Sequence, residues 1–450
     1  MSASYCITNV TLINEDRRFS GSLKIKGQFI EKIIKGPLSP DEPLQGYTII
    51  DGRGKWLIPG LIDDQVHFRE PGLTAKGDLY TEPKAAVAGG ITTYMEMPNT
   101  KPSATTQTLL SDKYAMAAEK SLANYSFYIG ASNTNLDELL KTDPKTVCGV
   151  KIFMGSSTGD LLVDDPDALE ALFRDVKILI ASHCEDDPLV KANHAAALSQ
   201  YGESMTAAMH PVIRNAEACY RSSAKAIELA TKYGTRFHIL HISTARETEL
   251  FRNDIPLRDK KITAEACVHH LWYTDEDYAE KGNFIKWNPA VKTRADRDAV
   301  RQALIDGRID VLATDHAPHT LAEKNAPYIH SPSGGPLVQH ALQALLELSF
   351  KGVFTPELIV RKYAHNVADM FSIDRRGYLR EGFYADVVLV DPEAEELVEK
   401  SNLLYKCGWS PFEGTTFRSK VSKTFVNGHL VYDNGLFNEE QRGMRILFNR

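Results

Sequence analysis

LIDDQVHF, at residues 61–68, is the first of eight short apolar runs that decide the fold of this 450-residue chain. The others are TTYMEM (92–97), NYSFYIG (124–130), GVKIFMG (149–155), KILIASHC (177–184), FHILHI (237–242), ITAEACVHH (262–270) and DVLATDH (310–316). Stretches with the composition of helices, such as TEPKAAVAGG (81–90), separate most of these runs. Eight strand–helix units in succession predict an α/β fold, a (β/α)8 barrel of the TIM type.

The two ends of the chain have a different texture. Residues 1–58 and 377–450 hold short runs rich in β-branched residues, separated by Gly, Asn and Pro. In the second segment, Asn427-Gly428 lies between two such runs and predicts a tight hairpin. We therefore expect a small β-sandwich domain built from residues 1–58 and 377–450, with the barrel spanning residues 59–376.

The composition is that of a globular protein and disfavours several other classes. Apolar residues make up 43% of the chain, which argues against extended disorder. The formal net charge is −7 without a long basic run, so neither nucleic acid nor a membrane surface is an expected partner. No apolar run reaches the roughly 18–20 residues of a membrane helix, and no signal-peptide pattern is visible. We expect a cytoplasmic protein with reduced cysteines, of which Cys184 and Cys267 should face out of their strands.

Side chains that bind metals gather at the carboxyl ends of the predicted strands. In a (β/α)8 barrel these ends form the catalytic face. His67, His183, His241 and Asp315 each lie at or near the end of an apolar run. Neutral imidazoles with a carboxylate suit Zn²⁺, which in a catalytic site keeps one position open for water. One such histidine alone would more often be a core residue, but the four residues together predict a zinc site.

Lys151 lies inside an apolar run, between Val150 and Ile152. Burying its ammonium group is costly, so two interpretations are open. The side chain either reaches the surface or an acidic partner, or it serves as a desolvated amine that adds CO₂. The resulting carbamate is an anionic ligand with two oxygens that can bridge two metal ions.

Several motifs resemble those of the cyclic amidohydrolase superfamily and, within it, the dihydroorotases. They are GLIDDQVHFREPG (60–72), MPNT (97–100), GVKIFMGSSTG (149–159), SHCED (182–186), LHIST (240–244), KWNPA (286–290), ATDHAPH (313–319) and SPFEG (410–414). The resemblance implies zinc-dependent, reversible hydrolysis of (S)-dihydroorotate to N-carbamoyl-L-aspartate in pyrimidine (UMP) biosynthesis. The resemblance also suggests that the protein forms a homodimer. Its expected binding partner is a small-molecule substrate.

The resemblance also implies roles for individual residues. The implied metal ligands are His67 at the more buried metal, His183 and His241 at the second, Lys151 as an N6-carboxylated bridge, and Asp315. The implied substrate-binding residues are Arg69, Asn99, Asn288, His319 and the loop backbone at Gly334 and Gly335. Arg69 and Asn99 would hold the substrate carboxylate, metal-bound hydroxide would attack the ring amide, and Asp315 would shuttle the proton.

One residue departs from the family pattern Asp-X-His-X-His. Gln65 stands at the position of the first histidine, between Asp63 and His67. An amide oxygen is a weaker zinc ligand than an imidazole, and strand alternation points the neighbouring Asp64 away from this face. We therefore expect one firmly bound zinc ion and a second site weakened by Gln65.

Three functions stay open at this stage. A dihydroorotase is favoured by HFREPG, because the arginine fork suits a substrate carboxylate. Arg69 has a structural alternative, a salt bridge with an acid such as Glu70. A dihydropyrimidinase or allantoinase would act on rings without that carboxylate. Gln65 leaves room for a catalytically impaired homologue that serves as a scaffold.

Overall fold

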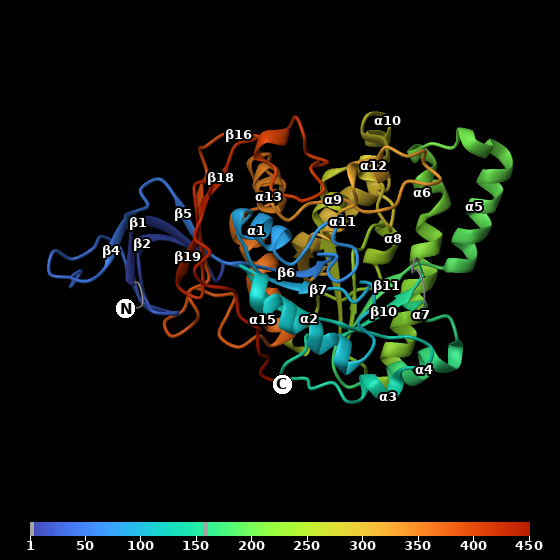
Figure 1. Cartoon of the computed structure of the whole chain (residues 1–450), viewed down its shortest axis with the longest axis horizontal. Coiled ribbons are helices and arrows are strands. Elements are labelled where there is room, and N and C mark those ends of the chain that lie inside the picture. The colour runs from blue at the N-terminus through green and yellow to red at the C-terminus, as the bar shows by residue number, and fades with distance from the viewer. Residues whose placement is uncertain (1–3, 156–160) are drawn as a thin grey trace.

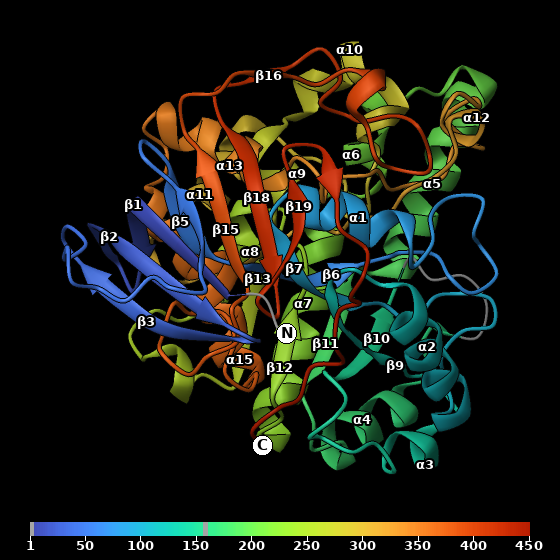
Figure 2. The same cartoon turned by 60° about the vertical axis from the view of Figure 1, so that its left-hand side comes forward.

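The structure, a computed structural model, describes residues 4–155 and 161–450. It consists of a barrel wrapped by helices and a large β-sheet packed against one side of that barrel (Figure 1). The sheet combines the first strands of the chain with the last, which lie beside one another in the view of Figure 2.

The barrel contains every strand that the apolar runs predict, in the same order. The strands are β6 (Leu61–Val66), β7 (Ile91–Glu96), β8 (Asn124–Phe127), β9 (Ile129–Gly130), β10 (Val150–Met154), β11 (Ile180–Cys184), β12 (Phe237–Ile239), β13 (Ile262–Cys267) and β14 (Val311–Ala313). Parallel pairing joins β6 to β8 and β9 to β14, and β8 runs into β9. A parallel bridge between Val66 and His316 joins the two outer edges. The predicted (β/α)8 barrel is confirmed.

Helices cover the outside of the barrel (Figure 1). They are α1 (Thr81–Ala88), α2 (Gln107–Lys120), α3 (Leu136–Leu139), α4 (Pro166–Asp175), α5 (Asp187–Tyr201), α6 (His210–Ile213), α7 (Ala216–Tyr233), α8 (Ala245–Thr248), α9 (Val268–Trp272), α10 (Tyr278–Lys281), α11 (Arg294–Asp306), α12 (Leu321–Lys324), α13 (Ala341–Phe350), α14 (Pro356–Val360) and α15 (Asn366–Phe371). The side chain of Asn215 caps the start of α7, and Gly234, in the left-handed conformation, ends it. Within the described ranges, no helix is both long and apolar enough to span a bilayer.

Both ends of the chain contribute to one sheet of nine strands within the described residues. Its strands are β1 (Ser4–Asn14), β2 (Arg17–Lys26), β3 (Phe29–Lys35), β4 (Thr48–Asp51), β5 (Trp56–Pro59), β15 (Val387–Asp391), β18 (Lys420–Val426), β19 (His429–Asp433) and β20 (Leu436–Phe437). The two halves meet where β5 pairs with β15, and the apolar core beneath them combines residues such as Leu23 and Val387. The predicted hairpin is present, since Asn427 and Gly428 have positive φ between β18 and β19. A separate two-stranded ribbon pairs β16 (Glu396–Leu397) with β17 (Thr416–Phe417).

Candidate active site

A cavity of about 310 Å³ opens at the carboxyl ends of the barrel strands. It is lined by residues from several strand ends and from the loop after β14: Gln65, His67, Arg69, Asn99, Lys151, Phe153, His183, His241, Trp287, Asn288, Asp315, Ala317, His319, Pro332, Ser333 and Gly334. The structure thus brings together all the residues for which the sequence predicts a role, with the exception of Gly335. Residues 156–159 of the motif at 149–159 lie outside the described residues.

His183 and His241 lie next to each other in the wall of the cavity, with their rings in edge-to-face contact. Nδ1 of His183 lies 3.0 Å from Nε2 of His241. Nε2 of His183 contacts Oε2 of Glu185 at 2.9 Å, and Arg214 binds the same carboxylate. Burial lowers the pKa of both imidazoles, so the neutral form that metals bind prevails. Glu185 therefore orients His183 in the way that an outer carboxylate commonly orients a metal-binding histidine.

A second group surrounds Asp315. Nε2 of His67 lies 3.1 Å from Oδ1 of Asp315, and Asn99 contacts Nδ1 of the same imidazole at 2.7 Å. Gln65 donates from Nε2 to Oδ1 of Asp315 at 3.2 Å, while its amide oxygen faces the thiol of Cys267 at 3.6 Å. Burial raises the pKa of Asp315 to about 7. The Gln65 amide therefore presents an N–H group rather than a lone pair to the other ligands.

Lys151 is buried in β10 and lines the cavity. Burial lowers the pKa of its amine to about 7. Its Nζ lies 4.6 Å from the centre of the Phe153 ring, and among the described residues no carboxylate forms an ion pair with it. Since the side chain neither reaches the surface nor meets an acid there, the structural interpretation of Lys151 loses its support. A large neutral fraction near pH 7 suits an amine that reacts with CO₂.

Arg69 is a buried cation with 6% of its surface exposed. Its Nε donates to the carbonyl oxygen of Pro318 at 3.0 Å, and Nη2 lies 3.1 Å from Nε2 of His319. Glu70 is not its partner, because that carboxylate binds Lys120 and the backbone N–H of Leu79. Within residues 4–155 and 161–450, no carboxylate forms an ion pair with Arg69. The salt-bridge interpretation of this arginine with Glu70 is therefore wrong.

The remaining candidate residues form the rim of the cavity. Oδ1 of Asn288 lies 3.1 Å from Nε2 of His210. His319 lies between Lys76, whose Nζ is 3.0 Å from Nδ1, and the carbonyl oxygen of Ser333, 3.0 Å from Nε2. In the tautomer whose Nδ1 accepts a hydrogen bond from the Lys76 ammonium, Nε2 donates to Ser333 and does not accept from the nearby Nη2 of Arg69.

Two glycines shape the loop on this rim. A Cβ at Gly334 would lie 2.4 Å from the carbonyl oxygen of Ala317, and a Cβ at Gly335 would lie 2.9 Å from the Trp287 ring. Two buried lysines hold the same loop by its carbonyl groups. Lys324 donates to Gly334 at 2.9 Å, and Lys286 donates to Tyr328 at 2.8 Å. The loop therefore forms a firmly held wall of the cavity.

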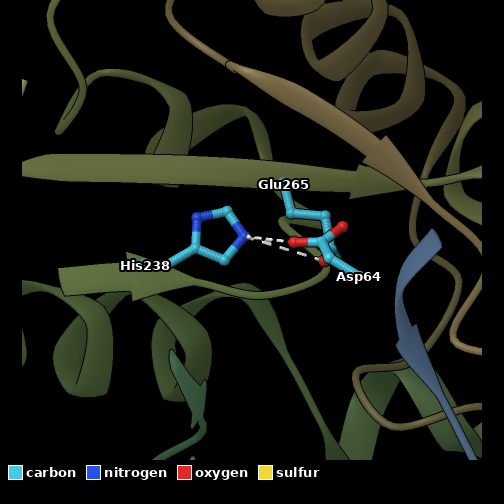
Figure 3. Close-up of side chains that lie close together, drawn as sticks. All are labelled: Asp64, His238 and Glu265. Atoms are coloured by element: carbon cyan, nitrogen blue, oxygen red, sulfur yellow. Dashed lines mark ion pairs between the residues drawn. The ribbon is translucent and has the colours of Figure 1, made fainter. Parts of the chain in front are cut away.

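Beneath the cavity lies a cluster that the sequence analysis did not identify (Figure 3). Asp64 on β6, His238 on β12 and Glu265 on β13 meet inside the barrel, all fully buried. Burial raises the pKa of Asp64 to about 6. For His238, burial alone would lower the pKa, but the two carboxylates outweigh it and raise the pKa to about 9. Asp64 does not belong to the group around Asp315, but it points into the barrel as Gln65 does, since the pairing of β6 is irregular between Asp63 and Val66. The sequence contained one indication of this cluster, namely that each of the three residues is an ionisable residue inside an apolar run.

The prediction that Cys267 faces outward is wrong. Its thiol donates to Oε1 of Glu265 at 3.1 Å and lies near Gln65, inside the barrel. β13 ends at Cys267 and α9 begins at Val268. His269 and His270 therefore belong to the helix, and they do not indicate which residues of the strand face inward. Cys184 contacts Ser182 at 3.5 Å and lies in the apolar core.

Comparisons with known proteins agree with this geometry. The sequence model of the amidohydrolase family matches residues 56–431. The chain is 34% identical to a dihydroorotase of Halobacterium salinarum over 403 residues, covering 87% of this chain and 90% of that one. A dihydroorotase of Lactobacillus johnsonii is 30% identical over 436 residues, covering 95% and 99%. Among solved structures, the L-hydantoinase (dihydropyrimidinase) of Arthrobacter aurescens has a TM-score of 0.92 at 23% identity, covering 99% of this chain and all of that chain. At that identity, the structural likeness establishes the fold alone.

Proposed function

This chain belongs to the amidohydrolase family and is a cyclic amide hydrolase, and from that premise we propose that it is a zinc-dependent dihydroorotase. The reaction would be the reversible hydrolysis of (S)-dihydroorotate to N-carbamoyl-L-aspartate, a step of pyrimidine biosynthesis. The curated relatives are named dihydroorotases, whereas the similar solved structures are hydantoinases. The residues of the cavity have to decide between these substrates.

The observation that carries the proposal is the buried guanidinium of Arg69. A buried cation without a paired anion is costly, and although the charges of Asp315 and Glu96 act on Arg69, no carboxylate among the described residues forms an ion pair with it. A substrate carboxylate would remove that cost through two parallel charge-assisted hydrogen bonds. Dihydroorotate carries such a carboxylate, whereas dihydrouracil, hydantoin and allantoin do not. Arg69 therefore favours dihydroorotate.

The side chains of the cavity fit the metal ions that this family generally uses. Nδ1 of His183 and Nε2 of His241, 3.0 Å apart, are close enough for both to bind one zinc ion. The carboxylated amine of Lys151 would complete that site and extend to a second one at His67 and Asp315. The second site is weaker because Gln65 directs an N–H group toward Asp315. When bound, zinc supplies a water acidic enough to ionise near neutral pH and polarises the amide carbonyl.

The protein's own groups position the ring and move the proton. Arg69 and Asn99 hold the carboxylate, while Asn288, His319 and the backbone at Gly334 hold the ring. Asp315 accepts a proton from the attacking water and passes it to the ring nitrogen that leaves. Its raised pKa suits a group that both accepts and returns a proton near neutral pH. The same residues serve cyclisation by microscopic reversibility.

The test is a hydrolysis assay with four substrates on one purified sample: dihydroorotate, dihydrouracil, hydantoin and allantoin. We expect turnover of dihydroorotate far above the other three, with about one zinc ion per chain in the catalytic cavity of the same sample. Preferred turnover of a ring without a carboxylate would replace this proposal by a dihydropyrimidinase or allantoinase. A zinc-loaded sample inactive on all four would favour a scaffold. We further propose that the protein acts in the cytoplasm as a homodimer.

A further inference from the structure

Asp64, His238 and Glu265 converge inside the barrel from three different strands (Figure 3). All three side chains have no exposed surface. The strands that hold them, β6, β12 and β13, also lead to Gln65 and His241, which line the cavity, and to Cys267, whose thiol lies 3.6 Å from the Gln65 amide oxygen. The cluster therefore lies one layer below the candidate active site and shares no residue with it.

Four polar atoms at the centre of this cluster have no hydrogen bond among the described residues, although Nε2 of His238 forms ion pairs with both carboxylates. Among the described residues, neither oxygen of the Asp64 carboxylate has a hydrogen-bond partner, and the same holds for Oε2 of Glu265 and Nε2 of His238. Buried polar atoms in native proteins are nearly always satisfied, and an orphaned group commonly marks an ion or a water. Two fully buried carboxylates need positive charge close by, and a protonated His238 supplies one positive charge against two negative ones.

The spacing of these atoms suits one small cation. Nε2 of His238 lies 3.3 Å from Oδ2 of Asp64 and 3.7 Å from Oε2 of Glu265. Two ligands of a tetrahedral zinc ion are about 3.4 Å apart, given bond lengths of 2.0–2.2 Å. Nδ1 of His238 lies 2.8 Å from the hydroxyl of Thr263, which fixes the ring with Nε2 toward the carboxylates. A divalent ion and two carboxylates also leave the interior electrically neutral.

We propose that Asp64, His238 and Glu265 bind a divalent transition-metal ion, zinc in the first instance, at a structural site separate from the catalytic centre. The ion links β6, β12 and β13. It also fixes Glu265, whose other oxygen accepts the backbone N–H of His241 at 3.0 Å. Since no ligand is exposed, the ion enters during folding and resists chelators afterwards, unlike an ion in the open cavity.

The first experiment measures metal content by plasma mass spectrometry. The protein is refolded from denaturant with zinc and then treated with a strong chelator under native conditions. We expect wild type to keep one zinc ion per chain and Asp64→Asn, which is isosteric but uncharged, to keep none. The control is Glu82→Gln, because Glu82 and His316 form a fully buried carboxylate–histidine pair at 2.8 Å without a second carboxylate. This variant should keep its zinc.

The same measurement can overturn the proposal. Wild type without a retained ion, or Asp64→Asn with the same retained ion as wild type, would contradict it. If Asp64→Asn fails to fold, a second measurement on the wild-type protein tests the same proposal. Anomalous diffraction from wild-type crystals at the zinc edge should give a peak between Nε2 of His238 and the two carboxylates. An absent peak there would mean that protons alone hold the cluster together.

Discussion

Replacing Arg69 by methionine tests the substrate assignment most directly. The substitution keeps similar bulk but removes the cation that we assign to the substrate carboxylate. A hydrogen bond to a charged group contributes about 1.5–3 kcal/mol, so kcat/KM for dihydroorotate should fall by about 10–150-fold. The loss of the contact from Nε to the Pro318 carbonyl adds a cost that is the same for every ligand.

The assay therefore compares ligands that differ only in the carboxylate. Affinities of orotate and uracil for wild type and Arg69→Met, measured by titration calorimetry, separate the two costs. We expect orotate to lose at least tenfold more affinity than uracil. Arg69→Lys serves as a control, since it keeps the charge but not the planar fork. Its affinity for orotate should lie between those of wild type and Arg69→Met. Equal losses for both ligands would refute the reasoning and make Arg69 a structural residue.

Three further predictions concern the metal ions. Gln65→His should raise zinc content toward two ions per chain in the catalytic cavity after mild dialysis, and two firmly held zinc ions there in wild type would contradict this. Because burial lowers the pKa of Lys151 to about 7, its amine is increasingly neutral above that pH; zinc uptake by metal-free protein with bicarbonate should therefore be faster at pH 8 than at pH 6, and a flat profile would argue against carboxylation. Glu185→Gln should weaken zinc binding about 10–100-fold by releasing His183, measured by competition with a chelator; an unchanged affinity would remove Glu185 from this role.

The barrel was predictable because its signal is local. Each strand is an apolar run bounded by polar residues, and the carboxyl end of each run identifies the face where functional groups meet. The residues that line the cavity follow these runs, so their proximity follows from the fold class. The sequence could not decide between the two roles of Arg69, because its alternative partner Glu70 is adjacent in the chain. Only the structure shows that Glu70 binds Lys120 instead.

Other groups of the site could not be found from local patterns. Arg214 follows helix α6, and Lys286 lies in a loop, so neither has a strand end to identify it. More than 170 residues separate Asp64 from His238, and more than 20 separate His238 from Glu265. Each of the three is an ionisable residue within an apolar run. Their meeting depends on the register between three strands, which alternation alone does not give.

The pairing of β5 with β15 has a consequence for synthesis of the chain. Pro59 pairs with Val387, so the partner of an early strand leaves the ribosome about 330 residues later. At roughly 5–20 residues per second, this interval lasts on the order of 20–60 s. During that time β5 presents an open edge, and apolar residues such as Leu57 have no cover. We therefore expect the nascent chain to need protection of this strand edge until the last 60 or so residues emerge.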